Sequence, residues 1–405
     1  MSKELNRREF LGVAGTAALA AGVSRTARSY AANETVNVAT IGTGGRCRHL
    51  MQALAKVPNA RIVAVCDIYD KHIEEGLKLA AEGAGATKEY REILDNKDID
   101  AVLIGSPDHW HVRMTIDACQ AGKDVYVEKP LTHDLSEGDA VIKAKNDTGR
   151  IVQVGTQQRS MPHYQEAYEI VKAGTLGKIH KVHLTWNRNH PRFEMRDYGV
   201  DPATVDWKKF LGNAPDQPYN EYKYRNWRWF WDFGGGIFTD LMVHKIDIVH
   251  WFLGLDHPEV ATSVGDHFQT EGLWQTPDTV QTLLRYPEQE LQAYFEGTFF
   301  NARNAAMIEF MGTDATLYID RGRYELYPET DREIAYREKI LGTGPRGADF
   351  YDRPDGEALH LANWIECIKS REEPNSPVEA GVSGASASHL ANKALRSGKV
   401  EHWEV

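Results

Sequence analysis

The sequence predicts an α/β fold with a doubly wound parallel sheet, followed by an α+β region whose sheet is mostly antiparallel. Three features predict it. Up to residue 155, short apolar strands alternate with helical segments, which is typical of a parallel sheet with helical crossovers. A glycine-rich turn follows the first strand. Beyond residue 155, strand segments follow one another at hairpin spacing, which predicts antiparallel pairing.

The N-terminus reads as an export signal. Arg7 and Arg8 form a twin arginine, an uncharged run of 14 residues follows at 10–23, and Ser29-Tyr30-Ala31-Ala32 ends in the small residues of a cleavage site. Fourteen residues are too few to span a bilayer as a helix. We therefore expect residues 1–31 to be a Tat signal peptide that sends the protein to the periplasm, without a membrane span. An uncleaved amphipathic anchor is the alternative.

The remaining chain is expected to form two domains, at residues 33–155 and 156–405, because about 370 residues exceed the usual size of one domain. In the first, we expect strands at 36–41, 61–66, 100–106, 124–128 and 151–155, a helix ending near 56, and helices at 109–121 and 136–146. In the second, we expect helices at 163–173, 243–253, 357–370 and 383–397, and strands at 179–186, 279–286, 291–298, 306–312, 316–320 and 324–328.

Charge and cysteine usage exclude several kinds of partner. Residues 1–31 carry five basic and two acidic residues, so the rest of the chain has a net charge of −14 rather than −11. This charge disfavours nucleic acid and anionic membranes as partners. The four cysteines, at positions 47, 66, 119 and 367, form no CxxC pair, so we expect no metal site.

The turn Gly42-Thr43-Gly44-Gly45-Arg46 matches the dinucleotide-binding fingerprint of a Rossmann fold. Gly42 permits the tight turn, and Gly44 lets the backbone approach a pyrophosphate at the helix N-terminus. Cys47 replaces the third glycine of the fingerprint. Asp67 ends the second strand, where a carboxylate would accept both ribose hydroxyls and repel a 2′-phosphate. NAD is therefore expected rather than NADP, with capping of the next helix as the alternative role of Asp67.

Polar residues also follow the later strands, where ligands of doubly wound sheets bind. They are Ser106-Pro107-Asp108, Glu128-Lys129-Pro130 and Thr156-Gln157. We expect Ser106, Pro107, Glu128, Lys129 and Gln157 to bind the cofactor. Because Lys129 ends an apolar strand, it should point into the cleft, where it could anchor a substrate hydroxyl. A cis bond before Pro130 would fix its direction, and pairing with Glu128 is the alternative.

A second chemical feature follows Gly234-Gly235-Gly236. Asp240 and His244 are four residues apart, which predicts that they share one face of a helix. A carboxylate beside an imidazole forms an acid/base unit, because it orients the ring and favours its protonated form. An ordinary surface pair is the alternative.

Together, Glu128-Lys129-Pro130-Leu131 and the glycine-rich helix with Asp240, His244 and Asp247 resemble the Gfo/Idh/MocA family (glucose–fructose oxidoreductase/inositol dehydrogenase). The resemblance runs from Val36 to the C-terminal helices. The stretch 106–111 matches the family's Ser/Thr-Pro-x-x-x-His pattern, which implies that His111 belongs to the cofactor site. The resemblance also implies Lys129, Asp240 and His244 as the catalytic group, an open second sheet, terminal helices packed back toward the first domain, and a homodimer or homotetramer.

The second domain carries candidate substrate residues. The segment 219–233 holds eight aromatic residues and leads into the three glycines. Aromatic faces pack well against sugars, although most of these rings are expected in the core. We expect Lys129, Asp240 and His244 to contact the substrate together with Arg159, Trp186, Asn187 and Trp231.

The residues thus predict an NAD(P)-dependent enzyme that removes a hydride from a secondary hydroxyl of a sugar, glycoside or cyclitol, with His244 taking the proton. No metal is needed, because the pyridinium is the electrophile. An exported enzyme of this kind must load its cofactor before export and retain it. The alternatives are an NAD-dependent glycosidase or lyase that oxidises its sugar transiently, and a non-catalytic sugar-binding protein.

Overall fold

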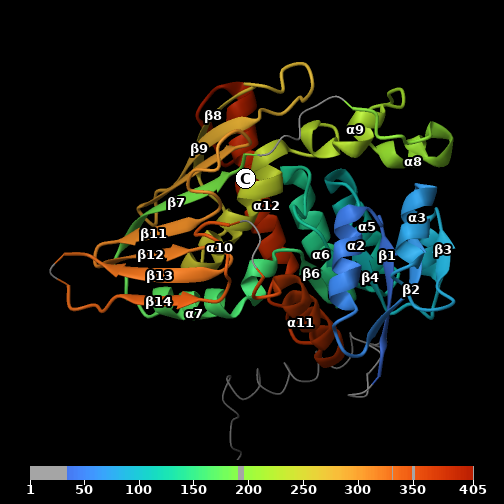
Figure 1. Cartoon of the computed structure of the whole chain (residues 1–405), viewed down its shortest axis with the longest axis horizontal. Coiled ribbons are helices and arrows are strands. Elements are labelled where there is room, and N and C mark those ends of the chain that lie inside the picture. Colours follow the sequence, from blue (N-terminus) through green and yellow to red (C-terminus); the bar gives the residue numbers. More distant parts are fainter. Residues whose placement is uncertain (1–33, 190–195, 331, 349–351, 405) are drawn as a thin grey trace, which may run out of the picture. The chain divides into compact units, whose positions relative to one another are not determined.

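Within the residues that it describes, the computed structural model contains two sheets, one of six and one of nine strands (Figure 1). The structure describes residues 34–189, 196–330, 332–348 and 352–404. Both sheets belong to one compact unit, Thr35–Val405. The predicted signal peptide lies outside the described residues.

The six-stranded sheet is parallel throughout, with the order β3-β2-β1-β4-β5-β6. Its strands are β1 (Val36–Ile41), β2 (Ala60–Cys66), β3 (Gly85–Thr87), β4 (Ala101–Ile104), β5 (Asp124–Val127) and β6 (Val152–Val154). Its helices are α2 (Gly45–Leu54), α3 (Asp70–Leu77), α4 (Tyr90–Asp95), α5 (Asp108–Gln120) and α6 (Gly138–Thr148), with the 3₁₀ turn η1 (Leu135–Glu137). The strand order reverses between β1 and β4, so a ligand crevice is expected at their carboxyl ends.

The nine-stranded sheet has the order β14-β13-β12-β11-β7-β10-β9-β8-β15 and is mostly antiparallel, β7 and β10 being a parallel pair. The strands are β7 (Ile179–Asn187), β8 (Val260–Asp266), β9 (Thr279–Tyr286), β10 (Leu291–Thr298), β11 (Ile308–Gly312), β12 (Ala315–Ile319), β13 (Arg323–Pro328), β14 (Arg337–Ile340) and β15 (Glu401–His402). Both sheets confirm the predicted fold class. We call them the parallel sheet and the mixed sheet.

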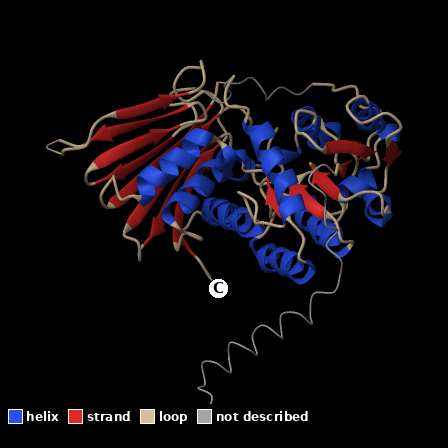
Figure 2. Cartoon of the chain, turned by 90° about the horizontal axis from the view of Figure 1, so that it is seen from below, coloured by secondary structure: helices blue, strands red, loops and turns tan. Residues whose placement is uncertain are grey.

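Helices cover one face of the mixed sheet and leave the other open (Figure 2). The covering helices are α7 (Pro162–Lys172), α10 (Val243–Leu253) and α12 (Val378–Ser397). Buried residues alternate with exposed ones along β9 and β10, as expected for strands with one dry face. Helix α12 also packs on α6 and β6, while α11 (Gly356–Ser370) packs on α2 and η2 (Gln157–Ser160).

A long connection crosses from the mixed sheet to the parallel sheet. We call residues 200–230 the strap. It contains η3 (Pro202–Thr204), α8 (Trp207–Leu211), α9 (Glu221–Arg225) and η4 (Trp227–Trp229). Its backbone is hydrogen-bonded to the chain just after β2, where the amide of Asp206 donates to the carbonyl of Ile68 at 3.0 Å. Farther along, the carbonyl of Phe210 lies 2.9 Å from His109 Nε2 and accepts from Trp110 Nε1 at 3.0 Å.

A buried ion pair joins η2 to α10. The guanidinium of Arg159 donates from Nε to both carboxylate oxygens of Asp247, at 3.0 and 2.9 Å. Burial raises the pKa of Asp247 even though Arg159 opposes the shift. Arg159 was predicted to contact the substrate. In the structure its guanidinium is buried against Asp247 and the ring of Trp251, so a substrate contact by Arg159 stays a prediction that these contacts do not favour.

We expect Arg159→Ala to lower the free energy of unfolding by about 3–5 kcal/mol, because it leaves the Asp247 carboxylate buried without its cation. Lys143→Ala is the matched control. It removes the exposed pair with Asp147, and such helix-surface pairs contribute only about 0.3–0.5 kcal/mol. Urea unfolding of both variants measures the difference. Equal losses would contradict a stabilising role for the buried pair.

Candidate active site

A cavity of about 320 Å³ lies at the carboxyl ends of β1, β2 and β4, where the strand order reverses. Seven of the predicted cofactor residues line it: Gly42, Gly44, Gly45, Arg46, Asp67, Ser106 and Pro107. The strap contributes the opposite wall, with Lys209, Phe210, Tyr224, Arg225, Trp227 and Arg228. The cavity is therefore enclosed by two segments that are far apart in the sequence.

The glycine turn fits the phosphates of a dinucleotide. Gly42 has a φ of +78°, and a Cβ there would lie 2.6 Å from the amide nitrogen of Ser106. Helix α2 begins without a side-chain cap and without an acidic residue in its first turn, so its first amides remain available to an anion. The buried Oγ of Ser106 has no hydrogen-bond partner among the described residues, and a bound ligand could supply one.

Asp67 both accepts a hydrogen bond at the start of α3 and lines the cofactor cavity, which are the two roles that the sequence left open. Its Oδ1 accepts from the amide of Tyr69 at 2.9 Å, just before α3 begins. Its Oδ2 lies 3.2 Å from His72 Nδ1, and the carboxylate also lines the cavity. A carboxylate has lone pairs beyond these two contacts, so it can still accept ribose hydroxyls.

The other predicted cofactor residues do not line this cavity; they are Thr43, His111, Glu128, Lys129 and Gln157. The Oγ1 of Thr43 donates to the carbonyl of Cys66 at 3.1 Å. His111 is fully buried, with Nδ1 at 2.6 Å from the carbonyl of Pro130 and Nε2 at 2.9 Å from that of Ser106. Both ring nitrogens of His111 thus connect two loops, and its contact with the cofactor stays a prediction.

Glu128 and Gln157 hold the Arg46 side chain in place through hydrogen bonds. The Nε of Arg46 donates to Glu128 Oε1 at 2.9 Å, and the amide of Gln157 reaches the same oxygen at 3.2 Å. The guanidinium also donates to Glu357 of α11 at 3.2 Å. Glu128 thus pairs with Arg46 rather than with Lys129, and it fixes the arginine at the cavity edge.

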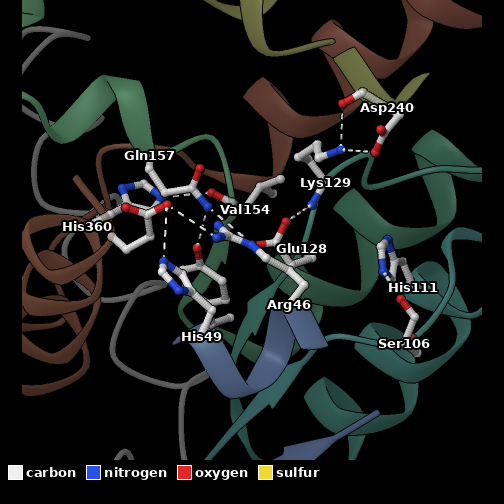
Figure 3. Close-up of polar contacts among 12 residues, drawn as sticks. Arg46, His49, Ser106, His111, Glu128, Lys129, Val154, Gln157, Asp240 and His360 are labelled. Carbon is white, nitrogen blue, oxygen red and sulfur yellow. Dashed lines mark hydrogen bonds and ion pairs between the residues drawn. The ribbon is translucent and has the colours of Figure 1, made fainter. Parts of the chain in front are cut away.

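Lys129, just after β5, and Asp240, in the turn before α10, point toward each other (Figure 3). The Lys129–Pro130 bond is cis, as the sequence suggested. The Lys129 ammonium donates to the carbonyl and to Oδ1 of Asp240, at 2.7 and 2.9 Å. The same Oδ1 accepts from Arg228 Nε at 3.1 Å. Burial would raise the pKa of Asp240, but Lys129 and Arg228 hold it well below its usual range.

Arg228 is a functional candidate that the sequence did not reveal. It lies in an aromatic segment and matches no spacing that would indicate a carboxylate partner. In the structure it lines the cavity and contacts Asp240, so it connects the strap to the catalytic candidates.

His244 does not pair with Asp240 in the described structure, which corrects the sequence prediction. Phe238–Met242 form a π-helical turn, and its wider spacing changes the angle between positions 240 and 244. The Nδ1 of His244 is buried and finds no partner in the described part of the chain. Burial, reinforced by Lys129 and Arg321, holds the pKa of His244 well below its ordinary value. The neutral imidazole is therefore favoured, not the imidazolium.

The remaining predicted substrate residues, Trp186, Asn187 and Trp231, lie in three different surroundings. Trp186 is 1% exposed, and its ring centroid lies 5.4 Å from that of His244. Asn187 follows it in β7 and points to the opposite face of the sheet, as successive strand residues do. There it donates to Glu296 and lines a separate hollow of about 350 Å³. Trp231 contacts Arg396, and its carbonyl lies 3.1 Å from His133 Nε2. Neither Asn187 nor Trp231 lines the cofactor cavity, and their contact with the substrate stays a prediction.

Other kinds of site are not found in the described ranges. No group of three or more His, Cys, Asp or Glu side chains is arranged there to hold a metal ion. The four cysteines are buried and free, including Cys47 and Cys66. In the same ranges, every helix is too short or too polar to cross a bilayer.

Comparison with known proteins agrees with this geometry. Residues 36–156 match an oxidoreductase family with an NAD-binding Rossmann fold, and residues 164–318 match the GFO/IDH/MocA C-terminal domain. The chain is 31% identical over 341 residues to the scyllo-inositol 2-dehydrogenase (NAD(+)) of Bacillus subtilis (strain 168), covering 80% of this chain and 84% of that protein. This chain belongs to the Gfo/Idh/MocA oxidoreductase family.

The family assignment confirms the predicted enzyme class, an NAD-dependent oxidoreductase. A more distant relative is the 2,7-anhydro-N-acetylneuraminate hydratase of Mediterraneibacter gnavus, 22% identical over 357 residues that cover 84% of each chain. Among solved structures, levoglucosan dehydrogenase in complex with NADH and levoglucosan superposes with a TM-score of 0.70 at 18% identity. That match covers 91% of this chain and 99% of the other, and it shows a shared fold.

We expect His244 to stay neutral at pH values well below its ordinary pKa of 6.5. Burial disfavours its charged form, and the nearby cations repel a further proton. Arg321→Gln should raise the pKa, because it removes one of those cations. An NMR titration of the His244 ring, assigned with His244→Asn, measures both values. Arg303→Gln, an exposed arginine on the open face of the mixed sheet, is the control. Protonation of the wild-type ring at or above pH 6.5 would contradict the expectation.

Proposed function

We propose that this enzyme oxidises a secondary hydroxyl of a sugar, glycoside or cyclitol, using NAD as the hydride acceptor. One observation carries the proposal: Lys129, from the end of β5, meets Asp240, from the mixed-sheet side, beside a cavity whose glycine turn fits a dinucleotide. Relatives named for inositol and levoglucosan dehydrogenation support the substrate class.

The chain's own residues can handle the proton and the oxygen of the alcohol. When bound, the nicotinamide supplies a hydride acceptor for the carbinol carbon. The Lys129 ammonium, held by Asp240, can donate a hydrogen bond to the substrate oxygen and stabilise it as an alkoxide forms. His244, neutral and beside this pair, is the candidate general base. A positioned base of this kind typically contributes about 10²–10⁴-fold in rate.

The strap supports a tightly held cofactor. Its aromatic and basic side chains form one wall of the cavity, so their contacts with a bound dinucleotide would slow its release. Tight retention would suit an enzyme exported already folded, because no soluble nicotinamide pool exists outside the cytoplasm. Export by the Tat pathway to the periplasm, and assembly as a homodimer or homotetramer, remain parts of this proposal.

Trp110→Phe should loosen the strap, because it removes the indole N–H that donates to the Phe210 carbonyl and keeps an aromatic ring. We expect NAD to dissociate about fivefold faster, as for the loss of one ordinary hydrogen bond. Trp403→Phe, near the C-terminus, is the matched control. Dissociation is followed by cofactor fluorescence after mixing with a trapping apoenzyme.

The retained cofactor can also be tested directly. Denaturing protein purified from its export-competent form should release NAD(H) into the supernatant. A cofactor-free supernatant would contradict loading before export.

A second candidate function is redox-neutral cleavage, in which transient oxidation acidifies a neighbouring C–H and permits elimination. The similarity to a hydratase favours keeping this candidate. It differs from net oxidation in its products, since the cofactor ends in the oxidised state.

A panel of glycosides and cyclitols distinguishes the two candidates. Net oxidation should give NADH and a keto product in equal amounts, whereas elimination should release an aglycone without NADH. We expect His244→Ala to lower turnover by about 10²–10⁴-fold, as for the loss of a general base. His257→Ala, which changes a half-buried histidine outside the cavity lining, should retain the wild-type rate. Wild-type turnover by His244→Ala would remove this residue from the mechanism.

A further inference from the structure

The lysines and arginines that line the cofactor cavity differ in whether they have a carboxylate partner. Five of the six are paired: Arg46 with Glu128 at 2.9 Å, Lys88 with Asp70 at 2.7 Å, Arg91 with Glu89 at 3.3 Å, Lys209 with Glu89 at 3.4 Å and Arg228 with Asp240 at 3.1 Å. The sixth, Arg225 in the strap, forms no ion pair with any residue that the structure describes. Its guanidinium lies 5.6 Å from the centre of the Tyr198 ring, an interaction that leaves its hydrogen-bond donors available.

The residues on both sides of Arg225 are anchored, so its place on the cavity wall is fixed. The buried ring of Tyr224 packs edge-on against Tyr69, with the ring centroids 6.1 Å apart. The side-chain amide of Asn226 donates to the hydroxyl of Tyr198 at 2.8 Å. The Arg225 side chain itself is exposed, so its charge stays hydrated until a ligand enters the cavity.

Two aromatic rings connect Arg225 to the glycine turn. Burial raises the pKa of Tyr69, and the charge of Arg225 opposes this shift, so the guanidinium acts on that ring. The rings of Tyr69 and His72 lie 4.8 Å apart. A Cβ placed on Gly44 would lie 3.8 Å from Cε1 of His72. Arg225 therefore belongs to the part of the cavity near the N-terminus of α2, where a pyrophosphate is expected.

We propose that Arg225 binds the pyrophosphate of NAD from the strap. This inference rests on the cofactor retention proposed above and names the residue that connects the strap to the bound cofactor. Guanidinium groups suit phosphate oxygens because they donate in a planar fork. Arg225 breaks no ion pair to make this contact. A 2′-phosphate is the competing anion, but Asp67 lines the same cavity and would repel it.

ADP and adenosine test the inference, because they differ only in the pyrophosphate. Each is used to displace NADH from the loaded enzyme, and its affinity is read from the loss of cofactor fluorescence. We expect Arg225→Gln to weaken ADP binding about tenfold, as for the loss of one hydrogen bond to a charged group. Adenosine should bind the variant and the wild-type enzyme equally well. NADH should also dissociate about tenfold faster from the variant, for the same reason.

Three controls separate the phosphate contact from a general loosening of the strap. Arg225→Lys should restore part of the ADP affinity, since it keeps the charge without the planar fork. Arg303→Gln, on the open face of the mixed sheet, should behave as the wild-type enzyme. Added salt should weaken ADP binding less steeply in Arg225→Gln than in the wild-type enzyme. A loosened strap would instead weaken ADP and adenosine by the same factor, and that result would overturn the inference.

Hydrogen exchange gives a measurement that needs no variant. In the wild-type enzyme, ADP should protect the amides of α9 more strongly than adenosine does, because only ADP reaches Arg225. Equal protection by the two ligands would contradict the contact.

The outcomes also distinguish this inference from the proposed function. Equal ADP affinity in the wild-type enzyme and Arg225→Gln would overturn the inference and leave the oxidoreductase function intact. A loss confined to NADP and 2′-AMP would overturn it as well, because it would place Arg225 at the ribose. A wild-type enzyme that releases NAD freely would count against cofactor retention, whereas the comparison of ADP with adenosine would still decide the role of Arg225.

Discussion

The shared carboxylate of Asp240 is the contact on which the rest of the site depends. Its Oδ1 accepts from Lys129 at the end of the parallel sheet and from Arg228 in the strap, while Asp240 itself precedes α10 on the mixed-sheet side. Three parts of the chain are therefore fixed relative to one another by one partly buried charge cluster. A buried carboxylate is costly unless it is paired, so loss of either cation would destabilise this arrangement as well as displace Lys129.

The charge cluster is also connected to the cofactor cavity. Arg228 belongs to the strap, and the strap forms one wall of that cavity. Phe210 is bonded through its carbonyl to the beginning of α5, and Tyr224 packs edge-on against Tyr69 at the end of β2. The wall over the dinucleotide is thus attached to the parallel sheet at two places and to the catalytic region at a third. Cofactor retention and catalytic geometry depend on the same segment, and a movement that released one would disturb the other.

The sequence predicted the fold because the buried strands are continuous apolar runs and the glycine turn has few other structural explanations. It predicted Lys129 because a lysine at the end of such a strand lies at the ligand edge. Its error at Asp240 and His244 arose from backbone geometry. Gly236 has a φ of +68° and packs against Thr276, and a π-helical turn follows, so helical spacing no longer applied. The placement of Asn187 was predictable, since adjacent residues of a strand face opposite sides. The role of Arg228 was not, because it depends on where the strap crosses the parallel sheet.

The cations near His244 also bear on how this residue could act as a base. A base whose pKa lies well below neutrality binds a proton weakly, whereas general catalysis works best when that pKa approaches the working pH. After burial, the Lys129 ammonium is the largest cause of the low pKa of His244. An alkoxide that forms beside this ammonium would offset part of its charge, and the pKa of the imidazole would rise. The base would then strengthen at the point of the reaction where it must hold the proton.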